Sequence, residues 1–137
     1  MSDRAKDIRL FERIAGQRLT AAGLLLQHHF FLESVYLAGY SVECAMKALI
    51  LRRTPGSKHE TMMDRLTKVG AKGHDFEYLK KLLKDCRCSF PSSVAEKLQV
   101  VTWWSTDLRY QVGTVAPADA QTFMNATQQI WKWARED

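Results

Sequence analysis

The segment 31–53 constrains the fold of this chain more than any other, because its residues are apolar on almost every side of a helix. Thr54, Pro55 and Gly56 end the helix, since proline disfavours helical geometry in the residue before it and glycine frees the backbone. A helix that is apolar all round is stable in water only when other elements cover it. The sequence therefore predicts a central helix inside a bundle of helices.

One polar stripe interrupts this apolar surface. It consists of two phenols, a carboxylate and an ammonium on one line of a helix that turns about 100° per residue: Tyr36, Tyr40, Glu43 and Lys47. Glu43 and Lys47 are four residues apart, in the order that favours an ion pair. Each buried polar group costs free energy unless it is paired. The stripe is therefore either an internal network that stabilises the bundle, or the wall of a cleft or of a self-association surface.

The rest of the chain also has helical periodicity, and it lacks the alternation typical of strands. Apolar residues recur at steps of three and four in further segments, with expected bounds of about 3–28, 59–70, 75–86, 92–104 and 117 onward. The prolines at 55, 91 and 117 fall where a helical pattern stops or starts, and 111–116 is expected to be a loop. About five helices with short connections predict an all-α, antiparallel up-and-down bundle, a single domain over residues 1–137.

Composition limits the possible chemistry. The net charge is +5, which permits an acidic partner without requiring one. An odd set of cysteines (Cys44, Cys86 and Cys88) argues against a disulfide framework, and the spacing of the last two is not that of zinc or redox motifs. We therefore expect no metal ion and no cofactor. The N-terminus lacks the features of a signal peptide and no run approaches the ~18 apolar residues of a membrane span, so we expect a cytoplasmic protein with no membrane partner.

Three segments, in the same order, resemble one family. Residues 36–50 (YLAGYSVECAMKALI) resemble the signature helix of HEPN domains (higher eukaryotes and prokaryotes nucleotide-binding). Residues 73–79 (GHDFEYL) are similar to a Gly-His-Asp-Leu segment of that family, and 104–110 (WSTDLRY) to the Trp-then-Arg-Tyr segment of one of its branches. The resemblance spans roughly residues 15–135. It implies a helical bundle that commonly forms homodimers and acts on or near RNA and nucleotides, often beside a small nucleotidyltransferase partner.

Many HEPN proteins are metal-independent RNases that use an Arg, four to six residues, and then a His. Such a pair can clamp a phosphate and act as a general acid–base. The resemblance places this Arg at Arg109, but the positions where the His should follow hold Thr114, Val115 and Ala116. The chain therefore resembles a branch without the RNase motif. A formal match, Arg53 followed by His59, lies in the loop after the second helix, which is the wrong place for the family.

Arg109 and Tyr110 remain candidate binding residues, because a guanidinium beside a phenol can clamp a phosphate or stack on a base. The structural alternative is an Arg109 paired with Glu43 or Asp107 inside the bundle. If the second and fourth long helices are neighbours, as the resemblance implies, Glu43, Lys47 and Arg109 meet near the two tyrosines. The polar stripe and this Arg-Tyr pair would then form one site.

Two further groups carry charge. His74 beside Asp75 is either a general-base pair or a residue that packs or caps at a helix start. A basic face on the helix 75–86 consists of Lys80, Lys81, Lys84 and Arg87. Such a face is either a solvated surface or a sequence-independent phosphate contact with strong salt dependence.

Three functions are compatible with these patterns. The first is a homodimeric nucleotide- or RNA-binding module with no RNase chemistry of its own, which works with a minimal nucleotidyltransferase partner in a toxin–antitoxin or defence-type system. The second is a diverged metal-independent RNase toxin with a site built from Arg109, Tyr110 and His74. The third is a structural or regulatory protein-interaction domain. The missing His after Arg109 favours the first over the second.

Overall fold

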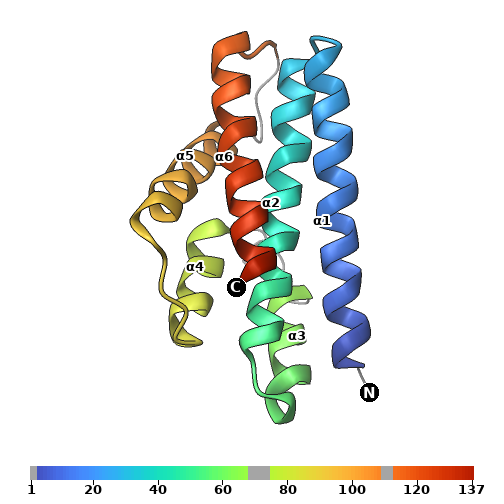
Figure 1. Ribbon diagram of the computed structural model, residues 1–137, viewed down its shortest axis with the longest axis vertical. Coiled ribbons are helices and arrows are strands. Elements are labelled where there is room, and N and C mark those ends of the chain that lie inside the picture. Colours follow the sequence, from blue (N-terminus) through green and yellow to red (C-terminus); the bar gives the residue numbers. More distant parts are fainter. Residues whose placement is uncertain (1–2, 68–74, 109–112) are drawn as a thin grey trace.

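The computed structural model describes residues 3–67, 75–108 and 113–137, with all side chains except those of 103–108. In this part of the chain there are six α-helices, one 3₁₀ turn and no strand (Figure 1): α1 (Arg4–Gln27), α2 (Phe31–Arg53), η1 (Gly56–Lys58), α3 (His59–Thr67), α4 (Phe76–Asp85), α5 (Ser92–Leu108) and α6 (Pro117–Glu136). The all-α bundle is confirmed. Each of the six segments expected to be helical contains a helix, and the short α3 lies in the expected segment 59–70.

The long helices α1, α2 and α6 form the body of the bundle, with α4 and α5 against the side away from α1 (Figure 1). The helices α1 and α2 form an antiparallel hairpin. The helix α6 lies beside α2 and runs in the same direction, because Arg52 and Arg53 at the end of α2 bond to Ala134 and Asp137 at the end of α6. The chain achieves this by returning through α3, α4 and α5 before α6 begins.

A tight turn joins α1 to α2. His29 has a positive φ of 65°, the left-handed conformation that commonly ends a helix. The amide of Phe30 donates to the Leu25 carbonyl at 2.9 Å, and that of His29 donates to the Leu26 carbonyl at 3.1 Å. These two bonds form a Schellman motif, which uses carbonyls that the helix leaves without intrahelical partners. The turn therefore fixes where α2 starts relative to α1.

Two buried serines set the register of this hairpin. Ser34 Oγ donates to the Ala22 carbonyl of α1 at 2.7 Å, and Ser41 Oγ donates to the Ala15 carbonyl at 2.7 Å. The serines are seven residues apart, which places them on the same face of α2. The alanines opposite them allow the two backbones to approach closely enough for a short side chain to bond across the interface.

The second half of α2 lies at the centre of the bundle. Every residue from 41 to 51 is buried, and Leu49, Ile50 and Leu51 have no exposed surface. By length and composition alone, α2 could also cross a membrane, but 78% of its most apolar window is buried inside the bundle. That degree of burial is what a central helix of a bundle requires. The prediction of a central helix over 31–53 is confirmed.

Polar contacts join the ends of the three long helices. Arg52, which is half-buried, bonds to Glu12 Oε1 of α1 at 2.7 Å and also to the Ala134 carbonyl of α6. Arg53 forms an ion pair with Asp137. One guanidinium thus contacts both neighbours of α2, which makes Arg52 the residue that links α1, α2 and α6 at this end.

Candidate functional site

The polar stripe of α2 has an exposed half and a buried half. The Tyr36 and Tyr40 residues are 47% and 39% exposed, whereas Glu43 and Lys47 are 7% and 4% exposed. On the same helix face, the two tyrosines are therefore in contact with water, whereas the two charged side chains are shielded from it. The predicted line of four polar residues is present, but only its N-terminal half is open to a ligand.

The buried half contains an ion pair. Lys47 Nζ lies 3.0 Å from Glu43 Oε2, and it also lies 5.8 Å from the centre of the Phe11 ring of α1. A cation over an aromatic face gains electrostatic energy, and more so away from water. A buried charge pair is retained only when its geometry offsets the cost of removing both charges from water. Lys47 therefore links the stripe to α1, which is the stabilising role that the sequence left open.

The exposed half consists of two aromatic rings. The Tyr36 and Tyr40 ring centroids are 5.4 Å apart with an interplanar angle of 64°, an edge-to-face pair. The i, i+4 spacing on a helix produces this proximity. Each ring offers an apolar face and a hydroxyl that can donate or accept a hydrogen bond. Such a pair can contact a nucleobase or the apolar surface of a protein.

Cys44 lies beside the ion pair. Burial raises its pKa from 9.0 to about 11; the nearby Glu43 carboxylate adds to this, and Lys47 and Arg18 act in the opposite direction. The thiol therefore stays protonated at neutral pH. Because the thiolate is the nucleophile, Cys44 has no catalytic role of that kind, and it packs as a small apolar residue as its position in the helix suggests.

This pKa makes a labelling experiment predictable. At about pH 8, a rise of two pKa units lowers the thiolate fraction about 100-fold, so native Cys44 should react with iodoacetamide at least about 100-fold more slowly than in the unfolded chain. Cys86, which is partly exposed, should react faster than Cys44 in the folded protein. Mass spectrometry of the labelled peptides measures both rates. Equal rates at Cys44 in the folded and unfolded chain would show that α2 is not buried there.

Several predicted site residues lie outside the described residues. These are His74, Arg109 and Tyr110, so their predicted roles stay predictions. The positions after Arg109 that are described hold an exposed Thr114, a buried Val115 and an Ala116 that directly precedes α6.

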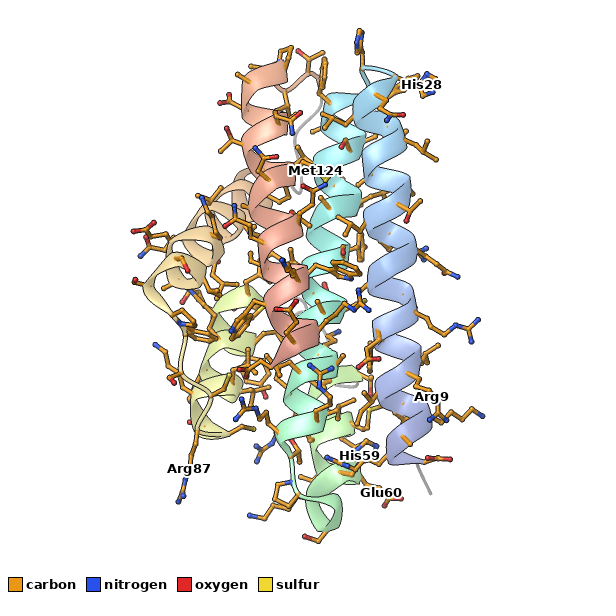
Figure 2. All side chains as sticks on the ribbon, in the orientation of Figure 1. Arg9, His28, His59, Glu60, Arg87 and Met124 are labelled. Atoms are coloured by element: carbon orange, nitrogen blue, oxygen red, sulfur yellow. The ribbon has the colours of Figure 1, made fainter. Side chains whose placement is uncertain are left out.

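The formal Arg53–His59 match does not form a catalytic pair. Arg53 is paired with Asp137, while His59 is buried against α1, with its Nε2 atom 2.8 Å from Asp7 Oδ2. Figure 2 shows His59, the first residue of α3, beside the N-terminal start of α1. Each residue thus has its own structural partner. Arg53 and His59 therefore do not act together as a phosphate clamp and an acid–base group, although their spacing in the sequence fits the motif.

The predicted basic face is divided as well. Lys80 forms an ion pair with Glu77 at 2.7 Å. The negative charge of Glu77 offsets the attraction of Lys80 for an anionic ligand. Lys81, Lys84 and Arg87 are exposed. Arg87 lies beyond the end of α4, at Asp85, rather than on the helix, and it extends outward from that corner (Figure 2). The exposed cations therefore extend from the middle of α4 to the corner just beyond its end.

Some contacts were not foreseen. The Arg52 contacts join helices distant in the sequence, and Phe90 packs edge-to-face on Trp133 with centroids 5.5 Å apart. No local pattern marks these contacts. The Ser34 and Ser41 bonds did have a signal, since two small hydroxyl residues recur seven positions apart on an otherwise apolar helix.

The described residues contain no group of three or more His, Cys, Asp or Glu side chains placed to hold a metal ion. In comparisons with known proteins, the family model of the HEPN domain matches residues 8–137. No curated protein and no solved structure matches the chain. Because the family model covers almost all of it and the observed bundle agrees, this chain belongs to the HEPN domain family.

Proposed function

We propose that this protein is a homodimeric nucleotide- or RNA-binding module that works with a nucleotidyltransferase-type partner in the cytoplasm, in a toxin–antitoxin or defence-type system. At the level of the family, the HEPN domain is a nucleotide- and RNA-related module. The observation that carries the more specific proposal is the exposed Tyr36–Tyr40 pair on the signature helix. In this proposal the pair contacts a base, while Glu43 and Lys47 hold the helix in place.

The physics of single-stranded RNA binding supports this use of the tyrosines. Bases stack on aromatic side chains with little dependence on sequence, and each contact contributes about 1–3 kcal/mol. The protein carries a net charge of +5, which attracts a polyanion to its surface. A rigid helix also holds both rings in place before binding, which reduces the entropy lost on association.

Two exposed apolar side chains of α1 support self-association. Leu10 and Leu24 are 51% and 54% exposed, and their separation of fourteen residues places them on one face of the helix. Large apolar side chains that gather on a surface are typical of interaction sites. Size-exclusion chromatography with light scattering tests this arm. A strict monomer at high protein concentration would exclude the homodimer without affecting the binding proposal.

The binding proposal predicts the result of removing one ring. Tyr36→Ala should weaken binding of a fluorescent single-stranded RNA about tenfold, because one stacking contact is lost, whereas Tyr36→Phe should stay within about twofold. Phe30→Ala is the matched control, since it removes another exposed ring beside the same helix. Fluorescence anisotropy at about 50 mM and about 200 mM salt measures the affinities and their electrostatic part.

Two results would contradict the proposal. The first is an absence of RNA and nucleotide binding at the lower salt concentration, and the second is equal losses for Tyr36→Ala and Phe30→Ala. The same RNA, incubated without metal ions and examined for cleavage, tests the RNase alternative. Cleavage that disappears in Arg109→Ala and His74→Ala would replace the proposal with a diverged RNase.

A further inference from the structure

A groove with two cationic side chains is lined by residues around the connection between α4 and α5. These two helices lie on the side of the bundle away from α1 (Figure 1). The groove has a volume of about 490 Å³, and it is shallow and open to solvent. The residues that line it come from the end of α4, the connection and the first turn of α5: Lys84, Arg87, Cys88, Ser89, Phe90 and Ala95. The α2 tyrosines are not among them.

The charges of the groove favour an anion. Lys84 and Arg87 supply two exposed cations, and no carboxylate lines the cavity. The nearby Asp137 forms an ion pair with Arg53 and accepts a hydrogen bond from Cys88 Sγ at 3.6 Å. Burial, followed by the effect of Asp137, raises the pKa of Cys88, so this thiol adds no negative charge. The helix α5 starts beside the groove, and the N-terminus of a helix also favours anions.

Arg87 occupies a position where a glycine would be expected. Its φ is 61°, and its amide donates to the Lys84 carbonyl at 2.9 Å while that of Cys88 donates to the Leu83 carbonyl at 3.0 Å. This is a Schellman motif, whose left-handed residue is usually glycine because other residues are strained there. The chain thus keeps a long cationic side chain at the edge of the groove in a strained conformation.

The groove also has an apolar wall. Phe90 is partly exposed and packs edge-to-face on Trp133 of α6, and Ala95 extends the same surface. Ser89 adds a hydroxyl that can bond to a phosphate oxygen or a sugar. A ligand that fits this wall has a charged end and a flat apolar end.

We propose that this groove binds a 5′-nucleotide unit, with its phosphate at Lys84 and Arg87 and its base against Phe90. The site is separate from the Tyr36–Tyr40 pair, and it deepens the proposed function by adding a second nucleotide contact at the α4–α5 corner. The unit can come from a free nucleotide or from the end of a single-stranded RNA, since both present the same phosphate and base.

Isothermal titration with AMP, adenosine and inorganic phosphate tests this ligand chemistry. AMP should bind at least about tenfold more tightly than either adenosine or phosphate, because only AMP engages both the cations and the apolar wall. Backbone amide shifts in an NMR titration should move at residues 84–95 and not at residues 36–40. Equal affinities for AMP and adenosine, or shifts confined to α2, would overturn the proposal.

Two substitutions separate binding from folding. R87G should weaken AMP binding about tenfold, yet its thermal midpoint should stay unchanged or rise, because glycine removes the strain at the positive φ. K81A is the matched control, since it removes an exposed charge from the same helix without touching the groove. It should change the affinity by less than twofold. An equal loss in K81A and R87G would mean that only the general charge of α4 matters, and would overturn the site.

A further arm identifies the source of the nucleotide and keeps the two proposals distinguishable. The competitors are a short RNA with a 5′-phosphate and the same RNA without it. If only the phosphorylated RNA competes with AMP, the groove binds RNA ends. If AMP binds and neither RNA competes, the groove binds free nucleotides. Tyr36→Ala should leave AMP affinity at the groove unchanged. If AMP fails to bind while RNA still depends on Tyr36, the groove is wrong and the proposed function stands.

Discussion

Replacing Lys47 with Met should destabilise the protein by about 3 kcal/mol, the low end of the cost of breaking a buried ion pair. The substitution keeps the length and apolar stem of the side chain, but it removes the ammonium that lies 3.0 Å from Glu43 Oε2. Glu43 is only 7% exposed, so the ammonium is lost from a site that is largely removed from water. Urea unfolding followed by circular dichroism measures the loss. For a domain of this size it corresponds to roughly 10 °C in the thermal midpoint.

A second variant shows whether the charge or the shape is responsible. The double substitution Glu43→Gln, Lys47→Met removes both charges and leaves groups of similar volume, and it should recover most of the loss, to within about 1 kcal/mol of the wild type. Lys81→Met, an exposed lysine to methionine change, should stay within about 0.5 kcal/mol. A loss for Lys47→Met no greater than that for Lys81→Met would contradict a stabilising role of the ion pair.

The Lys47→Met result bears on function because the Glu43–Lys47 ion pair follows the two exposed tyrosines on the same helix. If Lys47→Met lowers stability while RNA affinity at a temperature well below the midpoint is unchanged, the buried half of the stripe is structural. The site is then restricted to Tyr36 and Tyr40. In that outcome the structural interpretation holds for Glu43 and Lys47, and the binding interpretation remains a proposal for Tyr36 and Tyr40.

The sequence predicted the elements of the fold well because its signals are local. Helical periodicity, the prolines at 55, 91 and 117 and the polar spacing on 36–47 depend only on residues within a few turns of each other. The family resemblance was likewise visible in short segments, and the family model confirms it over residues 8–137. The ion pair between Glu43 and Lys47 follows from the same local geometry.

The sequence could not predict which half of the stripe is buried, since burial depends on the helices that pack against each part of α2. A helical wheel places Tyr40 and Glu43 on the same face, yet one is 39% and the other 7% exposed. The groove at the end of α4 was hidden for another reason. Arg87 continued the basic stripe in the sequence, whereas the left-handed turn at its φ of 61° carries it off the helix.

The last helix offers the second large effect. Phe123 lies in α6, has no exposed surface and is one of the largest fully buried side chains of the protein. Phe123→Ala should destabilise the protein by about 3–5 kcal/mol, because both the transfer of the ring and the cavity left behind cost free energy. Chemical unfolding, with a two-state analysis suited to a single domain of this size, measures the change.

Phe30→Ala is the matched control, because this ring is 54% exposed at the α1–α2 turn and its removal should cost less than about 0.5 kcal/mol. If Phe123→Ala lowers the free energy of unfolding by less than about 1 kcal/mol, α6 does not share the core with α2. If an intermediate with α6 detached is populated instead, unfolding should no longer be a single transition, and its fitted denaturant dependence should be lower than that of the wild type. Since α6 also carries Trp133 and Asp137 behind the α4–α5 groove, such detachment should abolish nucleotide binding there before it affects the Tyr36–Tyr40 pair.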